Sequence, residues 1–165
     1  MNNILNKKQK KNLFKKINKK LKMLYPEAKI ALNFSNPWEL LVAVILSAQT
    51  TDKKVNEITE KLFKKYKTFD DYLKADLKEF TNDIREVNYF RNKAKFILEN
   101  AKIIKEKFQG KVPDTMNDLM QLKGVARKTA NIVLSIIYNK YEGIAVDTHV
   151  KRLAKLLGLT NEVKP

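Results

Sequence analysis

The sequence contains no cysteine and only one histidine, His149. Without thiols, these 165 residues cannot form a disulfide, a zinc finger or a thiolate-bound iron–sulfur cluster. A single histidine also leaves little scope for a histidine-based metal site. We therefore expect no metal site and no cofactor built from the side chains of this sequence.

Glycine and proline are scarce, at four residues each, which disfavours a turn-rich all-β fold. The longest apolar run, residues 40–46, is far shorter than the ~18 residues that a membrane span requires. The N-terminus lacks the apolar stretch and the cleavage site of a signal peptide. These absences predict an intracellular, cytoplasmic protein with no membrane partner.

The charge balance is strongly basic, with 34 Lys and Arg against 18 Asp and Glu, a formal net charge of +16. Such an excess favours a polyanionic partner, most often nucleic acid. However, 30 of the basic residues are lysine and 16 residues are asparagine, a bias that an AT-rich coding genome also produces. Charge alone therefore leaves a solvated lysine-rich surface open as an alternative.

Apolar residues recur at helical spacing along the chain. Residues 1–22 carry nine lysines and no acid, with Leu13, Phe14, Ile17 and Leu21 on one side, which predicts a basic amphipathic helix. Pro37, with Asn36 or Ser35 as the cap, opens a helix whose residues 38–47 are apolar on nearly all sides. With no internal repeat and no alternating strand pattern, the sequence predicts an all-α fold of roughly eight to ten helices.

Residues 119–135 read as two helices joined by a tight turn that contains Gly124. The unpaired amides at the start of the second helix form an anion site, flanked by Lys123, Arg127 and Lys128. A helical hairpin without function is the plain alternative.

Residues 122–130, LKGVARKTA, resemble the helix-hairpin-helix signature of the endonuclease III family of DNA glycosylases, usually L-P-G-V-G/A-R-K-T-A. Residues 144–150, IAVDTHV, resemble its second signature, and residues 32–41 and 46–52 match as well. The resemblance is colinear from about Tyr25 to Leu159. Two departures stand out: Lys123 replaces the usual proline, and Asn88, which tolerates the left-handed conformation, replaces a common glycine.

The resemblance implies a six-helix barrel-like domain over residues 25–143, with the helix-hairpin-helix at about 115–138. Residues 1–24 and 144–165 would belong to an incomplete second helical domain, the latter carrying a catalytic aspartate. Family members continue with a four-cysteine loop that binds a [4Fe-4S] cluster. We expect no cluster in this chain, which is either a fragment or a clusterless member; the hairpin could hold a monovalent cation.

By the same resemblance, Lys128 is the nucleophile that attacks the sugar of a flipped nucleotide, and Asp147 stabilises positive charge on that sugar. An amine attacks only when neutral, a form that a helix N-terminus and a nearby Arg127 favour. Alternatively, Lys128 is one more solvated lysine and Asp147 a simple helix N-cap.

The implied DNA-binding residues are Gln49, which fills the gap left by the flipped nucleotide, and Tyr89, a wedge between bases. Ordinary packing at a helix junction is the alternative for Tyr89. Further contacts are implied for His149, although a packing histidine is the better reading, and for the hairpin residues Lys123, Gly124, Val125, Ala126, Arg127 and Thr129.

The resulting hypothesis is a base excision repair enzyme, a DNA glycosylase with AP lyase (β-elimination) activity on oxidised pyrimidines and abasic sites in duplex DNA. The alternatives are a non-catalytic or inactive truncated DNA-binding protein and a basic helical module that binds proteins. A monofunctional glycosylase would lack the hairpin lysine. We expect a nucleoid-associated monomer, unless the poorly covered helix in residues 1–22 self-associates.

Overall fold

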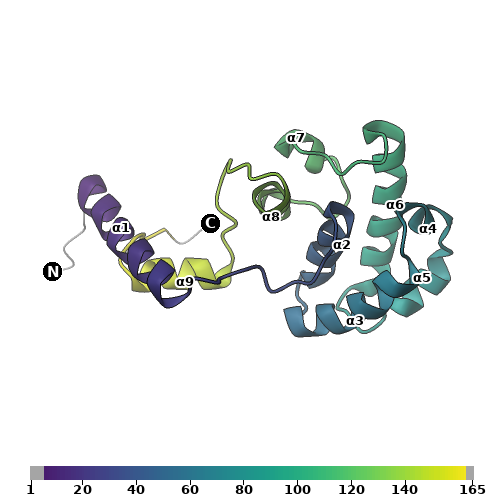
Figure 1. Ribbon diagram of the computed structural model, residues 1–165, viewed down its shortest axis with the longest axis horizontal. Coiled ribbons are helices and arrows are strands. Elements are labelled where there is room, and N and C mark those ends of the chain that lie inside the picture. Colours follow the sequence, from purple (N-terminus) through teal and green to yellow (C-terminus); the bar gives the residue numbers. More distant parts are fainter. Residues whose placement is uncertain (1–5, 163–165) are drawn as a thin grey trace. The chain divides into compact units, whose positions relative to one another are not determined.

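A computed structural model describes residues 6–162, and all regular secondary structure within that range is helical (Figure 1). The first five residues of the predicted basic helix lie outside the described range. The prediction of an all-α fold is confirmed. The helices are α1 Lys7–Leu24, α2 Pro37–Ser47, α3 Asp52–Lys65, α4 Phe69–Lys74, α5 Leu77–Asp83, α6 Phe90–Phe108, α7 Met116–Leu119, α8 Arg127–Ile137 and α9 Thr148–Leu156.

The chain divides into two compact units. One unit comprises residues 31–145 and holds α2 to α8, of which α7 is a single turn of four residues. The other combines residues 1–30 with residues 146–165 and holds α1 and α9. None of the helices in residues 6–162 is both long and apolar enough to cross a membrane.

Helix α2 forms the centre of the larger unit (Figure 1). All its residues from Trp38 to Leu46 are buried, and it contacts α3, α6 and α8. As the sequence predicts, Pro37 occupies the first turn, and the Asn36 side chain caps the helix by accepting the Glu39 N–H at 2.9 Å. A helix buried on every side needs this apolar sequence, because each face contacts another helix.

An aromatic cluster covers the start of α2. The Trp38 ring lies edge-on to Phe69 and Tyr72, with centroids 5.1 and 5.2 Å apart. Tyr66 packs against Tyr72 at 5.3 Å, and burial raises the pKa of Tyr66 to about 12. Because Trp38 is only 6% exposed and is the single tryptophan of the chain, its fluorescence reports on the folding of residues 31–145.

In the smaller unit, α1 begins with a capping box between Asn6 and Gln9. No residue of α1 is buried, and Phe14 and Leu21 are 51% and 47% exposed. Leu13 and Ile17 on the same side are half-buried, so the apolar side of this basic helix is only partly covered.

Candidate nucleic-acid interface

The predicted hairpin consists of α7, a tight turn and α8. Ala126 is the N-cap of α8 and makes no capping hydrogen bond through its side chain, so it leaves first-turn amides of the helix without the usual side-chain partner. Lys123, Arg127 and Lys128 are all exposed around this end of the helix. Positive charge and amide donors therefore meet at one place, as the sequence predicts for an anion site.

Val125 and Thr129 differ from the exposed hairpin residues. The Val125 side chain is 7% exposed and belongs to the core, and Thr129 is half-buried. A contact between Val125 and DNA would therefore have to come from its backbone.

Gly124 is required by the turn for two reasons. Its φ of +73° lies in the left-handed region, which favours glycine. A Cβ at this position would also lie 2.8 Å from Cδ2 of Phe96 on α6, well inside normal contact distance. The hairpin turn thus packs closely on α6.

Asn100 on α6 fixes the same turn, a role that the sequence analysis missed. It is fully buried, its Nδ2 donates to the carbonyl of Lys123 at 2.9 Å, and its Oδ1 accepts the Lys123 N–H at 2.6 Å. The proline that is usual at position 123 has no N–H to donate. In this chain the lysine therefore gains a backbone bond to Asn100 in addition to a charge.

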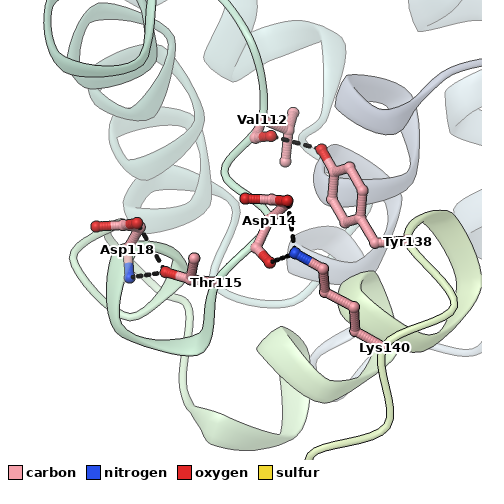
Figure 2. Close-up of polar contacts among 6 residues, drawn as sticks. All are labelled: Val112, Asp114, Thr115, Asp118, Tyr138 and Lys140. Atoms are coloured by element: carbon pink, nitrogen blue, oxygen red, sulfur yellow. Dashed lines mark hydrogen bonds and ion pairs between the residues drawn. The ribbon is translucent and has the colours of Figure 1, made fainter.

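The two ends of the hairpin are joined by a polar cluster (Figure 2). The Tyr138 hydroxyl, at the end of α8, donates to the carbonyl of Val112. Lys140 Nζ donates to the carbonyl of Asp114 at 2.8 Å and also pairs with its carboxylate, which lowers the pKa of Asp114. These contacts join the segment just before α7 to the segment just after α8.

The loops that carry Gln49 and Tyr89 lie side by side in the larger unit. Gln49 follows α2 with a φ of 56°, and Tyr89 precedes α6 with a φ of 57°. Both side chains are exposed, Tyr89 by 64%. A non-glycine residue in this region is strained by about 1–3 kcal/mol, so the surrounding contacts must hold both loops in place.

Asn88 provides two of these contacts. Its side-chain amide donates to the carbonyl of Gln49, and its backbone N–H donates to Oγ1 of Thr50 at 3.2 Å. Asn88 tolerates the left-handed conformation but does not adopt it, and its neighbour Tyr89 has the positive φ instead. Asn88 thus contributes the side-chain hydrogen bond to Gln49, and Tyr89 provides the left-handed backbone conformation of the turn.

Lys93 is the second residue that the sequence analysis missed. It lies in the first turn of α6, is 4% exposed, and donates from Nζ to the carbonyls of Leu46 at 2.8 Å and Ala48 at 2.7 Å. Burial lowers the pKa of Lys93 to about 8. Nothing in the sequence distinguishes this lysine from the other 29.

Asp147 and His149 belong to the smaller unit. Asp147 is the N-cap of α9, and its Oδ1 accepts the Val150 N–H at 2.8 Å, as the sequence predicts. The reading of His149 as a packing histidine is wrong, since its side chain is 75% exposed and its Nδ1 lies 3.2 Å from Oδ2 of Asp147. The pair forms at the surface because His149 is only two residues beyond the cap.

Within residues 6–162, no group of three or more His, Asp or Glu side chains could hold a metal ion. The 165 residues also contain no cysteine and so offer no thiolate ligand for an iron–sulfur cluster. A monovalent cation at the hairpin stays a prediction.

Comparison with known proteins identifies the family. Residues 42–165 match the model of the HhH-GPD superfamily base excision DNA repair protein. The chain is 47% identical over 145 residues to Endonuclease III of Synechocystis sp., an alignment that covers 88% of this chain. Two solved structures, a non-covalent Endonuclease III–DNA complex and a trapped Endonuclease III–DNA covalent intermediate, each superpose with a TM-score of 0.81 at 43% identity. Each superposition covers 88% of this chain and 67% of the Endonuclease III chain.

The chain spans 66% of the length of the Synechocystis protein, slightly less than two thirds. The family match nevertheless extends over most of this sequence and includes the hairpin, α8 and the Asp147 segment. This chain belongs to the HhH-GPD superfamily of base excision DNA repair proteins.

Proposed function

We propose that this chain is a DNA glycosylase with AP lyase activity that acts on oxidised pyrimidines and abasic sites in duplex DNA. The observation that carries the proposal is an exposed lysine, Lys128, in the first turn of the hairpin helix α8. The likeness to Endonuclease III structures with DNA, one of them a covalent intermediate, supports it. A mere surface lysine would not need to fall at the one hairpin position where the family has its nucleophile.

In this proposal, the neutral amine of Lys128 attacks C1′ of the flipped nucleotide and the bond from C1′ to the base breaks. The C1′–O4′ bond then opens, with the amine proton passing to O4′, and leaves a Schiff base between C1′ and Lys128. Loss of a proton from C2′ together with cleavage of the C3′–O bond completes the β-elimination. Exposure of Lys128 suits this step because Nζ must reach a substrate outside the protein. Lys93 cannot take the role, since its Nζ is buried and donates to backbone carbonyls.

Asp147 stabilises the positive charge that develops on the sugar and assists proton transfer. Its carboxylate is held by the α9 cap and remains 34% exposed. A capping hydrogen bond fits this role because it orients the carboxylate before the substrate binds.

Duplex DNA is bound in this proposal by three features of the larger unit. The α8 amides, with Lys123 and Arg127, contact backbone phosphate. Gln49 offers amide groups to the base that loses its partner, and the exposed ring of Tyr89 fills space between unstacked bases. The net charge of +16 favours association with the phosphate backbone.

Borohydride trapping on a duplex with one abasic site tests the proposal. The unchanged chain should form a covalent adduct and Lys128→Ala should form none, while binding to the same duplex stays within about tenfold. Lys123→Ala is the matched control, because it removes one hairpin charge but keeps the amine, so its adduct should still form. An adduct with Lys128→Ala would refute the assignment of Lys128 as the nucleophile. If even the unchanged chain formed no adduct, the result would favour a non-catalytic DNA-binding protein.

A further inference from the structure

Two strained loops with exposed tips are held together by one buried cation. Lys93 Nζ donates to the carbonyls of Leu46 and Ala48 and, at 3.4 Å, to Oγ1 of Thr50. Its three protons thus point to three acceptors at the end of α2. The backbone N–H of the same residue donates to the carbonyl of Tyr89 at 3.1 Å.

The position of this ammonium explains why it can be buried. Helix α2 has no basic residue in its last turn, so its carboxyl end lacks a cation of its own. The partial negative charge of a helix C-terminus attracts a cation, and Lys93 supplies it from α6. No ion pair to Lys93 is formed within residues 6–162, so backbone and hydroxyl oxygens alone compensate the charge. Burial of an unpaired lysine is costly, which makes a purely stabilising role a poor explanation.

Few contacts join the two loops. Within residues 6–162 they are the two bonds from Asn88, to Gln49 and Thr50, the bonds from Lys93, and an exposed ion pair of 3.0 Å between Glu86 and Lys54 at the start of α3. Thr50 Oγ1 belongs to both sets, because it accepts from the Asn88 N–H and from Lys93 Nζ. Removal of Lys93 would therefore loosen the Gln49 loop directly and the Asn88–Thr50 bond indirectly.

We propose that Lys93 is a positioning residue for an opened base pair: its buried ammonium ties the end of α2 to the start of α6 and holds Gln49 and Tyr89 at one fixed spacing. The inference rests on the proposed function, in which these two side chains act on the same base pair. A fixed spacing matters because loops that are already ordered lose no conformational entropy when they bind DNA. The occupied protons of Lys93 exclude contact with the substrate itself.

The first part of the test needs no DNA. Lys93→Met keeps the length and removes the charge, and Lys95→Met, an exposed lysine on the same helix, is the matched control. Amide hydrogen exchange at Thr50 and Asn88 should become about tenfold faster or more in Lys93→Met alone, while the urea midpoint followed by Trp38 stays near that of the unchanged chain. Unchanged exchange at both amides would overturn the inference, whatever the chain does with DNA.

The second part compares two duplexes, one undamaged and one with a tetrahydrofuran abasic site opposite 2-aminopurine. In Lys93→Met, the ratio of the affinity for the abasic duplex to that for the undamaged duplex should fall about tenfold, the scale of one charge-assisted hydrogen bond. The affinity for the undamaged duplex itself should stay within about threefold. The 2-aminopurine emission that Gln49 and Tyr89 alter should return toward that of free duplex. Lys95→Met should shift both affinities equally, because it only removes a surface charge.

Thr50→Val provides a milder variant if Lys93→Met does not fold. It removes the shared hydroxyl and retains the shape, so the preference should fall in the same direction by about threefold. A folded Lys93→Met or Thr50→Val chain with the full preference would overturn the inference. An unchanged chain that binds both duplexes equally would instead refute the proposed function, and with it the DNA-facing half of this inference.

Discussion

Replacement of Asn100 by alanine should destabilise the larger unit, because a single buried amide holds the hairpin turn. The substitution removes two hydrogen bonds to the backbone of Lys123, of 2.9 and 2.6 Å. Each bond contributes about 1 kcal/mol net, and backbone groups left without partners add to the loss, for a total of about 2–3 kcal/mol. With a urea m-value of about 1–1.5 kcal/mol/M, the midpoint should fall by about 1.3–3 M.

Urea unfolding followed by the fluorescence of Trp38 measures this change, because the single tryptophan lies in the same unit as Asn100. Asn92→Ala is the matched control: it is an exposed asparagine on the same helix and should shift stability by less than about 0.5 kcal/mol. Equal midpoints for the two variants would refute the reasoning.

Lys123→Pro sharpens the argument, since it restores the residue that is usual at this position. Proline in a loop commonly adds about 0.4–1 kcal/mol of stability, but it destabilises where the N–H is hydrogen-bonded. Here it removes the donor to the buried Oδ1 of Asn100, so we expect a loss of about 1–2 kcal/mol. Asn100→Ala combined with Lys123→Pro should cost less than the sum by about 1 kcal/mol, and additivity within about 0.3 kcal/mol would contradict the coupling.

Three further changes have defined outcomes. Gly124→Ala should cost about 2–3 kcal/mol, because a Cβ there combines a φ of +73° with a 2.8 Å approach to Phe96; Phe96→Leu in the same chain should recover part of the loss in urea unfolding, and no recovery would rule out the clash. Burial lowers the pKa of Lys93 to about 8, whereas an unfolded lysine titrates near 10.4, so the unfolded chain binds the extra proton between these values. The free energy of unfolding should accordingly rise from about pH 8 to pH 10 relative to Lys93→Met, and equal slopes would contradict this sign. Asp147→Asn keeps a good cap for α9 but removes the charge, so base excision should slow about a hundredfold or more with unchanged thermal unfolding; activity within a few-fold would reduce Asp147 to a cap.

The sequence by itself determined the features whose interactions are local. The caps at Asn36 and Asp147 were readable because each side chain bonds an amide three residues along the chain. The positive φ of Gly124 in the hairpin turn follows from similarly short-range geometry. The all-α fold followed from helical periodicity and from the scarcity of glycine and proline.

Only the tertiary structure decided which polar residues hold these local pieces together. Lys93 reaches the carbonyl of Leu46 across 47 positions, and Asn100 reaches Lys123 across 23. No spacing rule marks such pairs, because a lysine or asparagine on a helix is normally solvated and only the packing of α6 against its neighbours buries these two. The exposed His149 and the left-handed Tyr89 were missed for the same reason: the burial of a side chain and the residue that bends a loop depend on which segments fold against it.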